Sequence, residues 1–223
     1  MAENGNAVLR FDYEADGDSE GVLSDINLDS WHDDIVDAAN FVQEQCKVGS
    51  VNLYGLRLGG SLAWLAANSL NIDNVLLWDP IIDGKEYFNQ LLRFNLTAQL
   101  STYGGVQKER NELLKLIESG DKVNILGYEI HKSLADSLYS TTLNDTNRPD
   151  CHISIICSSP SSNPKPSKEL SVLLNETDIP YTMVKSRPFW NEPRLIDNQQ
   201  SAMVESSIAL MCESLKSSEA IQA

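Results

Sequence analysis

The sequence predicts an α/β fold, in which helices cover a mostly parallel β-sheet of about five strands. Two observations lead to this prediction. Apolar, β-branched runs alternate with amphipathic helical patterns, which is the order of the right-handed crossovers in parallel sheets. The strand-like runs are also almost continuously apolar, as expected for strands with helices on both faces.

The first strand is expected at 7–13 (AVLRFDY), and a loop rich in Asp, Gly and Ser follows it at 14–27. A helix capped by Asp29 or Ser30 comes next. It continues to Val42, because its apolar residues recur at spacings of three and four. These three segments form the first crossover.

A second crossover surrounds a glycine-rich turn. A strand at 48–54 enters the turn at 55–60, and a compact helix of small and apolar residues leaves it at 61–70. A further strand at 72–78 ends at Asp79, which precedes a proline. We therefore expect the turn to lie at the carboxyl end of the sheet.

The middle of the chain has a different pattern, since 84–147 is more polar and its apolar residues have helical spacing. The sheet pattern then returns. The remaining elements are a strand at 151–157, a loop at 158–167, a helix at 168–174, a strand at 181–186, a loop at 188–197 and a helix at 198–215. The chain thus divides into a first core part (1–83), a helical cap insertion (84–147) and a second core part (148–223).

Composition excludes several classes of function. The chain has 223 residues, with 17 Lys and Arg against 32 Asp and Glu, and a net charge of −15. This balance argues against binding to nucleic acid or to an anionic membrane surface. No apolar run reaches the ~18–20 residues of a membrane span, and the first residues do not form a signal peptide. Four widely spaced cysteines are typical of free thiols in a cytoplasmic protein, and no spacing predicts a metal or a cofactor.

The turn at 55–60 carries the most chemical information. It has the pattern G-x-R-x-G-G, with Arg57 in the middle. In a nucleophile elbow, G-x-S-x-G, small residues let the strand and the helix approach closely, and the middle residue is held in a strained conformation. Arg57 occupies the position of the nucleophile, and a guanidinium cannot attack a carbonyl. The N–H of Leu58 is the only oxyanion-type donor expected from this turn.

Several further segments extend this likeness. The run 8–13 (VLRFDY) is followed by 16–21 (DGDSEG), and 76–80 (LLWDP) and 189–193 (FWNEP) come later in order. Together with the elbow, they resemble the α/β-hydrolases over nearly the whole chain, in particular the exosortase-associated hydrolases of bacterial exopolysaccharide systems. The resemblance implies a hydrolase of esters or thioesters.

Departures from that family affect the expected function. Compared with the family, the chain begins at the fourth strand. The resemblance therefore implies that the strand at 8–13 is an exposed sheet edge, through which two copies pair as a homodimer. No histidine follows Ser186, where the family has its general base, and no aspartate directly follows Cys157. A Ser–His–Asp triad cannot be assembled, and the three histidines are interpreted as surface or packing residues.

Arg57 has two interpretations. It binds a carboxylate or a phosphate beside the N-terminus of the following helix, or it pairs internally with Asp79 or Asp12.

Other candidates have similar alternatives. Ser61 is a displaced nucleophile or a helix-capping residue. Asp79 contacts a ligand at the carboxyl end of its strand or terminates that strand. Cys157 is a thiol nucleophile or a buried thiol. Trp190 lines a pocket or belongs to a buried closing loop, and Leu56 is a further candidate for lining the site.

Two functions follow from these residues. The first is a catalytically degenerate α/β-hydrolase-like protein, a pseudoenzyme, which binds a small anionic ligand or a partner protein. The second is an ester or thioester hydrolase with an unusual site, linked to exopolysaccharide systems.

Overall fold

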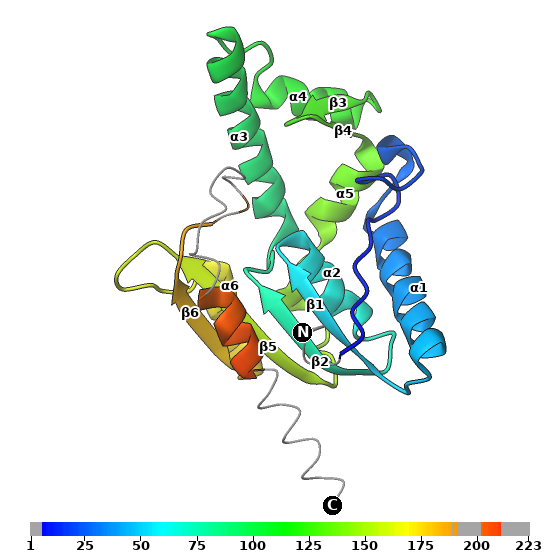
Figure 1. The fold of residues 1–223 in the computed structure, drawn as a ribbon. Coiled ribbons are helices and arrows are strands. Elements are labelled where there is room, and N and C mark those ends of the chain that lie inside the picture. Colours follow the sequence, from blue (N-terminus) through cyan, green and yellow to red (C-terminus); the bar gives the residue numbers. More distant parts are fainter. Residues whose placement is uncertain (1–5, 189, 191–201, 211–223) are drawn as a thin grey trace, which may run out of the picture. The chain divides into compact units, whose positions relative to one another are not determined.

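The computed structural model describes residues 6–188, 190 and 202–210 (Figure 1). The chain forms two compact units. The first, here called the sheet unit, comprises Met1–Leu9, Ala38–Ile82 and Thr146–Ala223. The second, the helical unit, comprises Arg10–Asp37 and Asp83–Asp145. No helix in the described ranges is long and apolar enough to cross a membrane.

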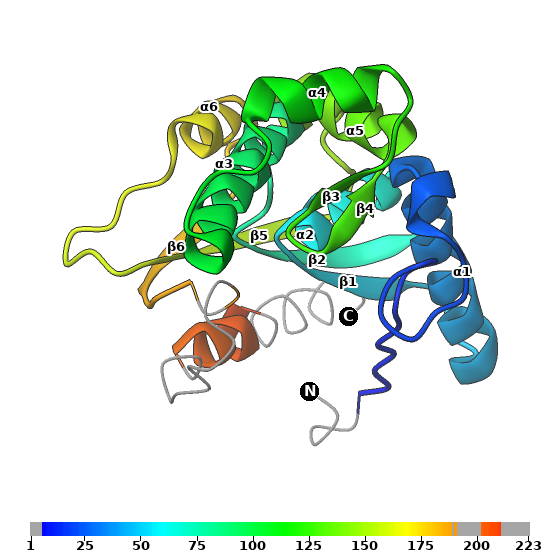
Figure 2. The same cartoon turned by 90° about the horizontal axis from the view of Figure 1, so that it is seen from above.

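The sheet unit contains four parallel strands in the order β1-β2-β5-β6. The strands are β1 (Val51–Leu56), β2 (Ile72–Trp78), β5 (His152–Ser159) and β6 (Tyr181–Lys185). The helix α2 (Leu58–Ala66) and the helical segment 202–210 lie on opposite sides of this sheet (Figure 2). The predicted α/β class is confirmed, with a sheet covered on both faces.

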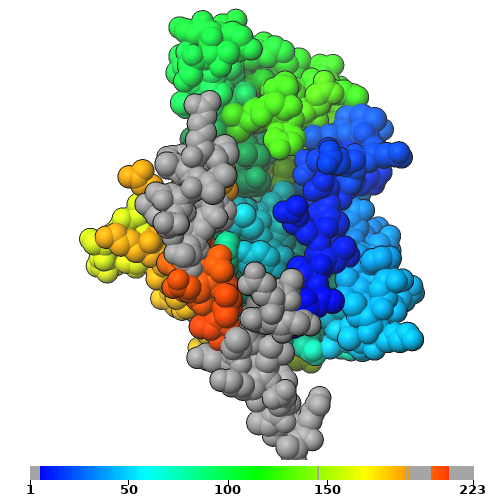
Figure 3. Space-filling view, in the orientation of Figure 1, coloured from blue at the N-terminus to red at the C-terminus, as the bar shows by residue number. Residues whose placement is uncertain are grey.

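Two clusters of apolar side chains explain this covering. On the side of α2, Leu62, Ala63 and Ala66 are almost completely buried. On the other side, Met203 is fully buried and packs with Leu76, Trp78, Ile156 and Val184. Figure 3 shows the segment 202–210 (orange-red) beside the strand β6 (amber) at the surface of this unit. β2 and β5 therefore have apolar cover on both faces, as their nearly continuous apolar sequences predict.

The strand predicted at 7–13 is not formed, which is a correction to the expected sheet. Residues 6–13 have no strand structure, and Val8 and Leu9 are 59% and 42% exposed. A strand needs a neighbour that satisfies its main-chain groups, and local β-propensity does not supply one. The ring of Tyr13 instead lies 5.6 Å from that of Trp31. Within the described residues, the main sheet has four strands and not about five.

Helix boundaries also differ from the prediction. The helix α1 (Leu28–Cys46) starts before Asp29, and its cap is Asn27, whose side-chain oxygen accepts from the N–H of Ser30 at 3.0 Å. The helix α6 (Lys168–Thr177) follows Ser167, which caps it in the same way through the N–H of Leu170. In both helices, side-chain hydrogen bonds to the first turn fix the start.

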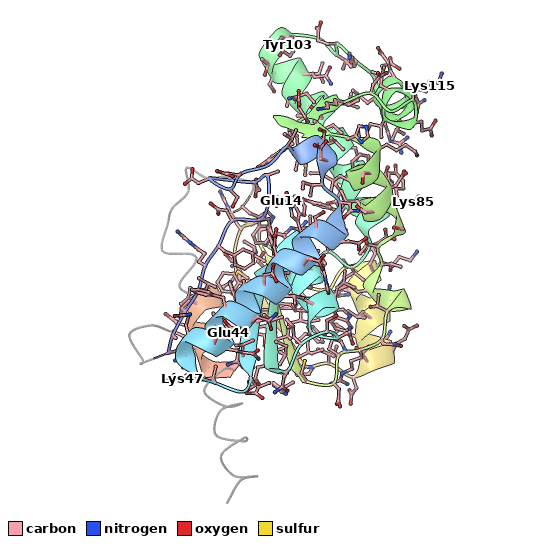
Figure 4. All side chains as sticks on the ribbon, turned by 90° about the vertical axis from the view of Figure 1, so that its right-hand side faces the viewer. Glu14, Glu44, Lys47, Lys85, Tyr103 and Lys115 are labelled. Atoms are coloured by element: carbon pink, nitrogen blue, oxygen red, sulfur yellow. The ribbon has the colours of Figure 1, made fainter. Side chains whose placement is uncertain are left out.

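The helical unit contains α3 (Gly84–Tyr103), α4 (Arg110–Glu118) and α5 (Lys132–Ser140), together with the short helices η2 (Leu23–Asp25) and η3 (Leu143–Asp145). It also contains a hairpin, β3 (Val123–Ile125) and β4 (Tyr128–Ile130), that the sequence analysis missed. Its two-residue turn, Leu126-Gly127, has positive φ at both positions, and a leucine there gives no turn signal. Figure 4 shows Tyr103 at the end of α3 and Lys115 on α4.

Candidate functional site

The connection between β1 and α2 is a single residue, Arg57, which is shorter than the turn predicted at 55–60. Its φ and ψ are 55° and −122°, a region that residues other than glycine rarely adopt. The N–H of Arg57 donates to the carbonyl of Trp78 at 2.9 Å, and its own carbonyl accepts from the N–H of Gly60 at 3.0 Å. These bonds hold the strained residue at the carboxyl end of the sheet, as in a nucleophile elbow.

Two glycines allow this close approach of strand and helix. A Cβ atom on Gly55 would collide with the carbonyl of Gly59. A Cβ atom on Gly60 would lie 3.1 Å from the carbonyl oxygen of Gly55. Because main-chain atoms cannot rotate away, Gly55 requires glycine, and a Cβ atom on Gly60 would make a tight contact. The G-x-R-x-G-G pattern therefore encodes the elbow backbone.

The guanidinium of Arg57 contacts Asp79 and Trp190. Its Nη1 atom donates to the main-chain carbonyl of Asp79 at 3.1 Å. Its Cζ atom lies 5.2 Å from the centroid of the Trp190 ring, within the range of a cation–π contact. The hydrogen bond to Asp79 is thus with its main chain, whereas the expected internal pairing is with its carboxylate and stays a prediction. Asp12 belongs to the helical unit, where its carboxylate accepts from the N–H of Asp18 at 3.2 Å.

Asp79 joins the ends of β2 and β5. Its N–H donates to the carbonyl of Ile156 at 2.9 Å, and its carboxylate accepts from the N–H of Ser158 at 3.0 Å and 3.2 Å. Burial raises the pKa of Asp79, while the hydrogen bonds from Ser158 and the charge of Arg57 oppose this shift. Burial therefore disfavours the charged form of the Asp79 carboxyl, while Ser158 and the positive charge of Arg57 favour it.

Cys157 and Ser61 are both withdrawn from solvent. Burial, followed by the charge of Asp79, raises the pKa of the Cys157 thiol to about 12. Cys157 is 5% exposed, and its protonated thiol is a poor nucleophile. Ser61 is 1% exposed, and its hydroxyl donates to the carbonyl of Ile81 at 2.6 Å. The positions of both residues fit packing roles rather than nucleophilic attack.

Leu56 and Leu58 flank Arg57 on opposite sides. The side chain of Leu56 packs against the apolar cluster around Met203 and contributes to the core. Leu58 is the first residue of α2, so its N–H is one of the first-turn donors that have no acceptor within the helix. That this N–H acts as an oxyanion-type donor stays a prediction.

His152, the histidine of the sheet unit, lies far from the elbow along the strands. His152 begins β5 and lies opposite Asn74 of β2. Asn74 in turn lies opposite Asn52 of β1, five residues before Arg57. At ~3.3 Å per residue, the elbow lies about 16 Å from that level of the sheet. His32 and His131 belong to the helical unit, where they contact Asp33 and the carbonyl of Gly120.

Ser158, whose N–H holds the Asp79 carboxylate, is not among the residues predicted for the site. A signal was available, because this residue directly follows the buried run CHISIIC at the carboxyl end of a predicted strand. Across the described part of the chain, no three His, Cys, Asp or Glu side chains come together as ligands for a metal ion.

No family model and no curated protein sequence matches the chain. Solved structures match its fold. The Est1E structure from Butyrivibrio proteoclasticus, with ferulic acid bound, has a TM-score of 0.61 at 14% identity, over 92% of this chain and 76% of that one. A putative hydrolase from Agrobacterium vitis S4 has a TM-score of 0.54 at 20% identity, over 88% and 74%.

An α/β superfamily hydrolase from Oenococcus oeni PSU-1 has a TM-score of 0.52 at 17% identity, over 92% of this chain and 80% of that one. The Agrobacterium vitis and Oenococcus oeni proteins are described as hydrolases. At these identities the likeness concerns the fold. The chain therefore has the fold of the α/β-hydrolases.

Proposed function

We propose that this protein binds a small carboxylate or phosphate at the elbow and does not hydrolyse esters through a serine nucleophile. The observation that carries the proposal is Arg57, which occupies the apex of the elbow with φ 55° and ψ −122°. This strained position places a permanently charged guanidinium where an esterase of this fold has its attacking atom.

Three features of the elbow favour an anion. A guanidinium offers N–H donors in a fixed plane, which match the oxygens of a carboxylate or a phosphate. The first turn of α2 begins at Leu58 and adds N–H groups and the positive end of a helix dipole. The ring of Trp190 covers one side of the guanidinium at 5.2 Å, which orients its plane.

Ester hydrolysis has little support from the same residues. Ser61 donates its hydroxyl to Ile81, and Cys157 has a raised pKa. His152 lies toward the opposite end of the sheet from Arg57. A general base contributes roughly 10²–10⁴-fold to such a reaction, so the loss of base and nucleophile together leaves no efficient route. The link to exopolysaccharide systems rests on the resemblance of 8–13 and 16–21, and it stays a prediction.

Anion binding is tested by thermal and chemical unfolding in inorganic phosphate, acetate or benzoate, with chloride as the reference at equal ionic strength. At about ten times the dissociation constant, a bound anion raises the free energy of unfolding by roughly 1.4 kcal/mol. We expect this increase in the parent protein and not in Arg57→Gln. Each variant is compared with itself in chloride, because Arg57 also contacts Asp79.

Arg93→Gln is the matched control, since Arg93 is an exposed arginine paired with Glu86 in the helical unit. It should keep the full response to the anion. An Arg57→Gln variant that responds as the parent does would rule out the site. Separate responses to phosphate and to the carboxylates distinguish the two ligand classes.

Ester hydrolysis is tested with p-nitrophenyl acetate and a fluorophosphonate probe. We expect turnover at the background rate and no labelled serine. Labelling of one serine, with turnover that is lost when that serine is replaced by Ala, would favour the ester or thioester hydrolase instead.

A further inference from the structure

β1 is an edge strand, because no strand in the described ranges pairs with its outer side. Two hydrogen bonds show which of its residues face β2. The N–H of Val51 donates to Asn71 at 3.3 Å, and the N–H of Arg57 donates to Trp78 at 2.9 Å. Main-chain groups alternate in direction along a strand. Asn52, Tyr54 and Leu56 therefore each turn one N–H and one C=O away from β2.

The edge lacks the features that usually prevent pairing. Natural edge strands carry charged residues, prolines or bulges that block another strand. The sequence of β1, VNLYGL, contains no charged residue and no proline. Its one register shift lies at the start, between Val51 and Asn52. Tyr54 is 45% exposed, although it is a large side chain in the middle of the strand.

We propose that β1 pairs with β1 of a second copy of this chain, antiparallel across a two-fold axis. The axis passes beside Tyr54, so that Tyr54 lies opposite the partner's Tyr54 and Asn52 lies opposite the partner's Leu56. In this register, every outward N–H meets an outward C=O, because Asn52, Tyr54 and Leu56 are spaced by two. The two sheets then become continuous.

A second copy fits this edge for an electrostatic reason. The chain carries a net charge of −15, so most of its surface repels another copy. Two such molecules can approach each other at an uncharged strand, because no like charges then lie opposite each other. A two-fold axis also closes the assembly at two copies, since the same strand is used on both sides. The interface replaces the one expected at 8–13, which has no strand structure, and it is independent of the anion site.

The dimer is tested by sedimentation velocity over a dilution series. One pair of strands buries less surface than a standard interface, so the series extends to about 100 µM. We expect the parent to form a dimer in a concentration-dependent way. Tyr54→Lys places two like charges opposite each other and should give a monomer. Phe41→Lys is the matched control, because Phe41 is 54% exposed on α1, and it should dimerise as the parent does.

A crosslink tests the register. In a hydrogen-bonded antiparallel pair the Cα atoms are ~5.5 Å apart, which suits a disulfide. With Cys46 and Cys212 replaced by Ser, Tyr54→Cys should form an intermolecular disulfide under mild oxidation, and Phe41→Cys should not. Circular dichroism checks that each variant is folded. If Tyr54→Lys unfolds, Asn52→Pro replaces it, because it removes an outward N–H. It also removes the hydrogen bond from Asn74 to the Asn52 side chain at 2.7 Å, so Asn52→Ala is the reference that loses this bond alone and should dimerise as the parent does.

A parent protein that remains monomeric at the top of the series would overturn the proposal. A dimer that persists with unchanged affinity in folded Tyr54→Lys, or in Asn52→Pro, would also overturn it. Crosslinking of Phe41→Cys as readily as Tyr54→Cys would contradict the proposed register and hence the proposal.

Discussion

Arg57, Asp79 and Cys157 show how neighbouring charges change one another at the end of the sheet. The guanidinium lowers the pKa values of both the carboxyl and the thiol, but burial outweighs it in each case. The Asp79 charge adds to the shift of Cys157. At neutral pH, the site therefore combines a permanent cation with a thiol that remains protonated.

This raised pKa predicts a loss of stability in alkaline solution. The pKa of Cys157 is about 12 in the folded chain and about 8.5 in an unfolded one. Between these values the unfolded state binds fewer protons, so its ionisation lowers the free energy of unfolding as the pH rises. We expect Cys157→Ala to reduce this slope in urea unfolding between about pH 8.5 and 10.

Thiol modification provides a second measurement of Cys157. At pH 8, iodoacetamide should modify the exposed Cys46 in the native protein and leave Cys157 unmodified until the protein is unfolded. Peptide mapping by mass spectrometry separates the two sites. Equal native rates at Cys46 and Cys157 would contradict the burial of this thiol.

The elbow shows how two elements determine each other's position. β1 ends at Leu56 and α2 starts at Leu58, so the chain reverses its direction at one residue. This is possible because Gly55 and Gly60 bring main-chain atoms of the strand and the helix into contact. The strain at Arg57 is then offset by its hydrogen bonds to Trp78 at the end of β2 and to Gly60 in α2.

Gly55→Ala is expected to destabilise the protein by roughly 2–4 kcal/mol, because the new Cβ atom meets a main-chain carbonyl that cannot move without displacing α2. Gly49→Ala is the control, since no atom lies within 4 Å of its Cβ position. The control should change the free energy of unfolding by less than about 0.5 kcal/mol. Urea unfolding of the two variants gives the comparison, and equal effects would argue against close packing at the elbow.

At the scale of the whole molecule, the sheet unit is completed by residues that are distant in sequence. The indole of Trp78 donates to the hydroxyl of Ser207 at 2.8 Å, across 129 residues of chain. Met203 packs in the same apolar cluster as Trp78 and is fully buried. In the described part of the chain, the strands formed early thus receive apolar cover on this face from the segment 202–210.

Met203→Ala should therefore cost about 2–5 kcal/mol of unfolding free energy, because it leaves a cavity between that segment and the sheet. Val204→Ala is the matched change one residue later, at a side chain that is 44% exposed. It should shift the free energy by less than about 0.5 kcal/mol. If Met203→Ala behaves like Val204→Ala in denaturant unfolding, the segment does not cover the sheet.

Local sequence patterns correctly predict the α/β class, the position of the elbow and, to within about two residues, three of the four main strands. Strand β2 occupies the predicted residues, 72–78, and Arg57 lies at the predicted apex. These features are local. Apolar period, glycine spacing and the residue at the apex can all be read within about ten neighbouring positions.

Tertiary structure alone decided the remaining features. Segment 7–13 has the composition of a strand, but no neighbour accepts its main-chain hydrogen bonds in the described structure. Leu56 could line a pocket or the core, and the helical segment 202–210 places it in the core. The Asp79 carboxylate meets Ser158, 79 residues away. Pairing and burial depend on segments distant in sequence, and a local pattern does not specify which distant segment arrives.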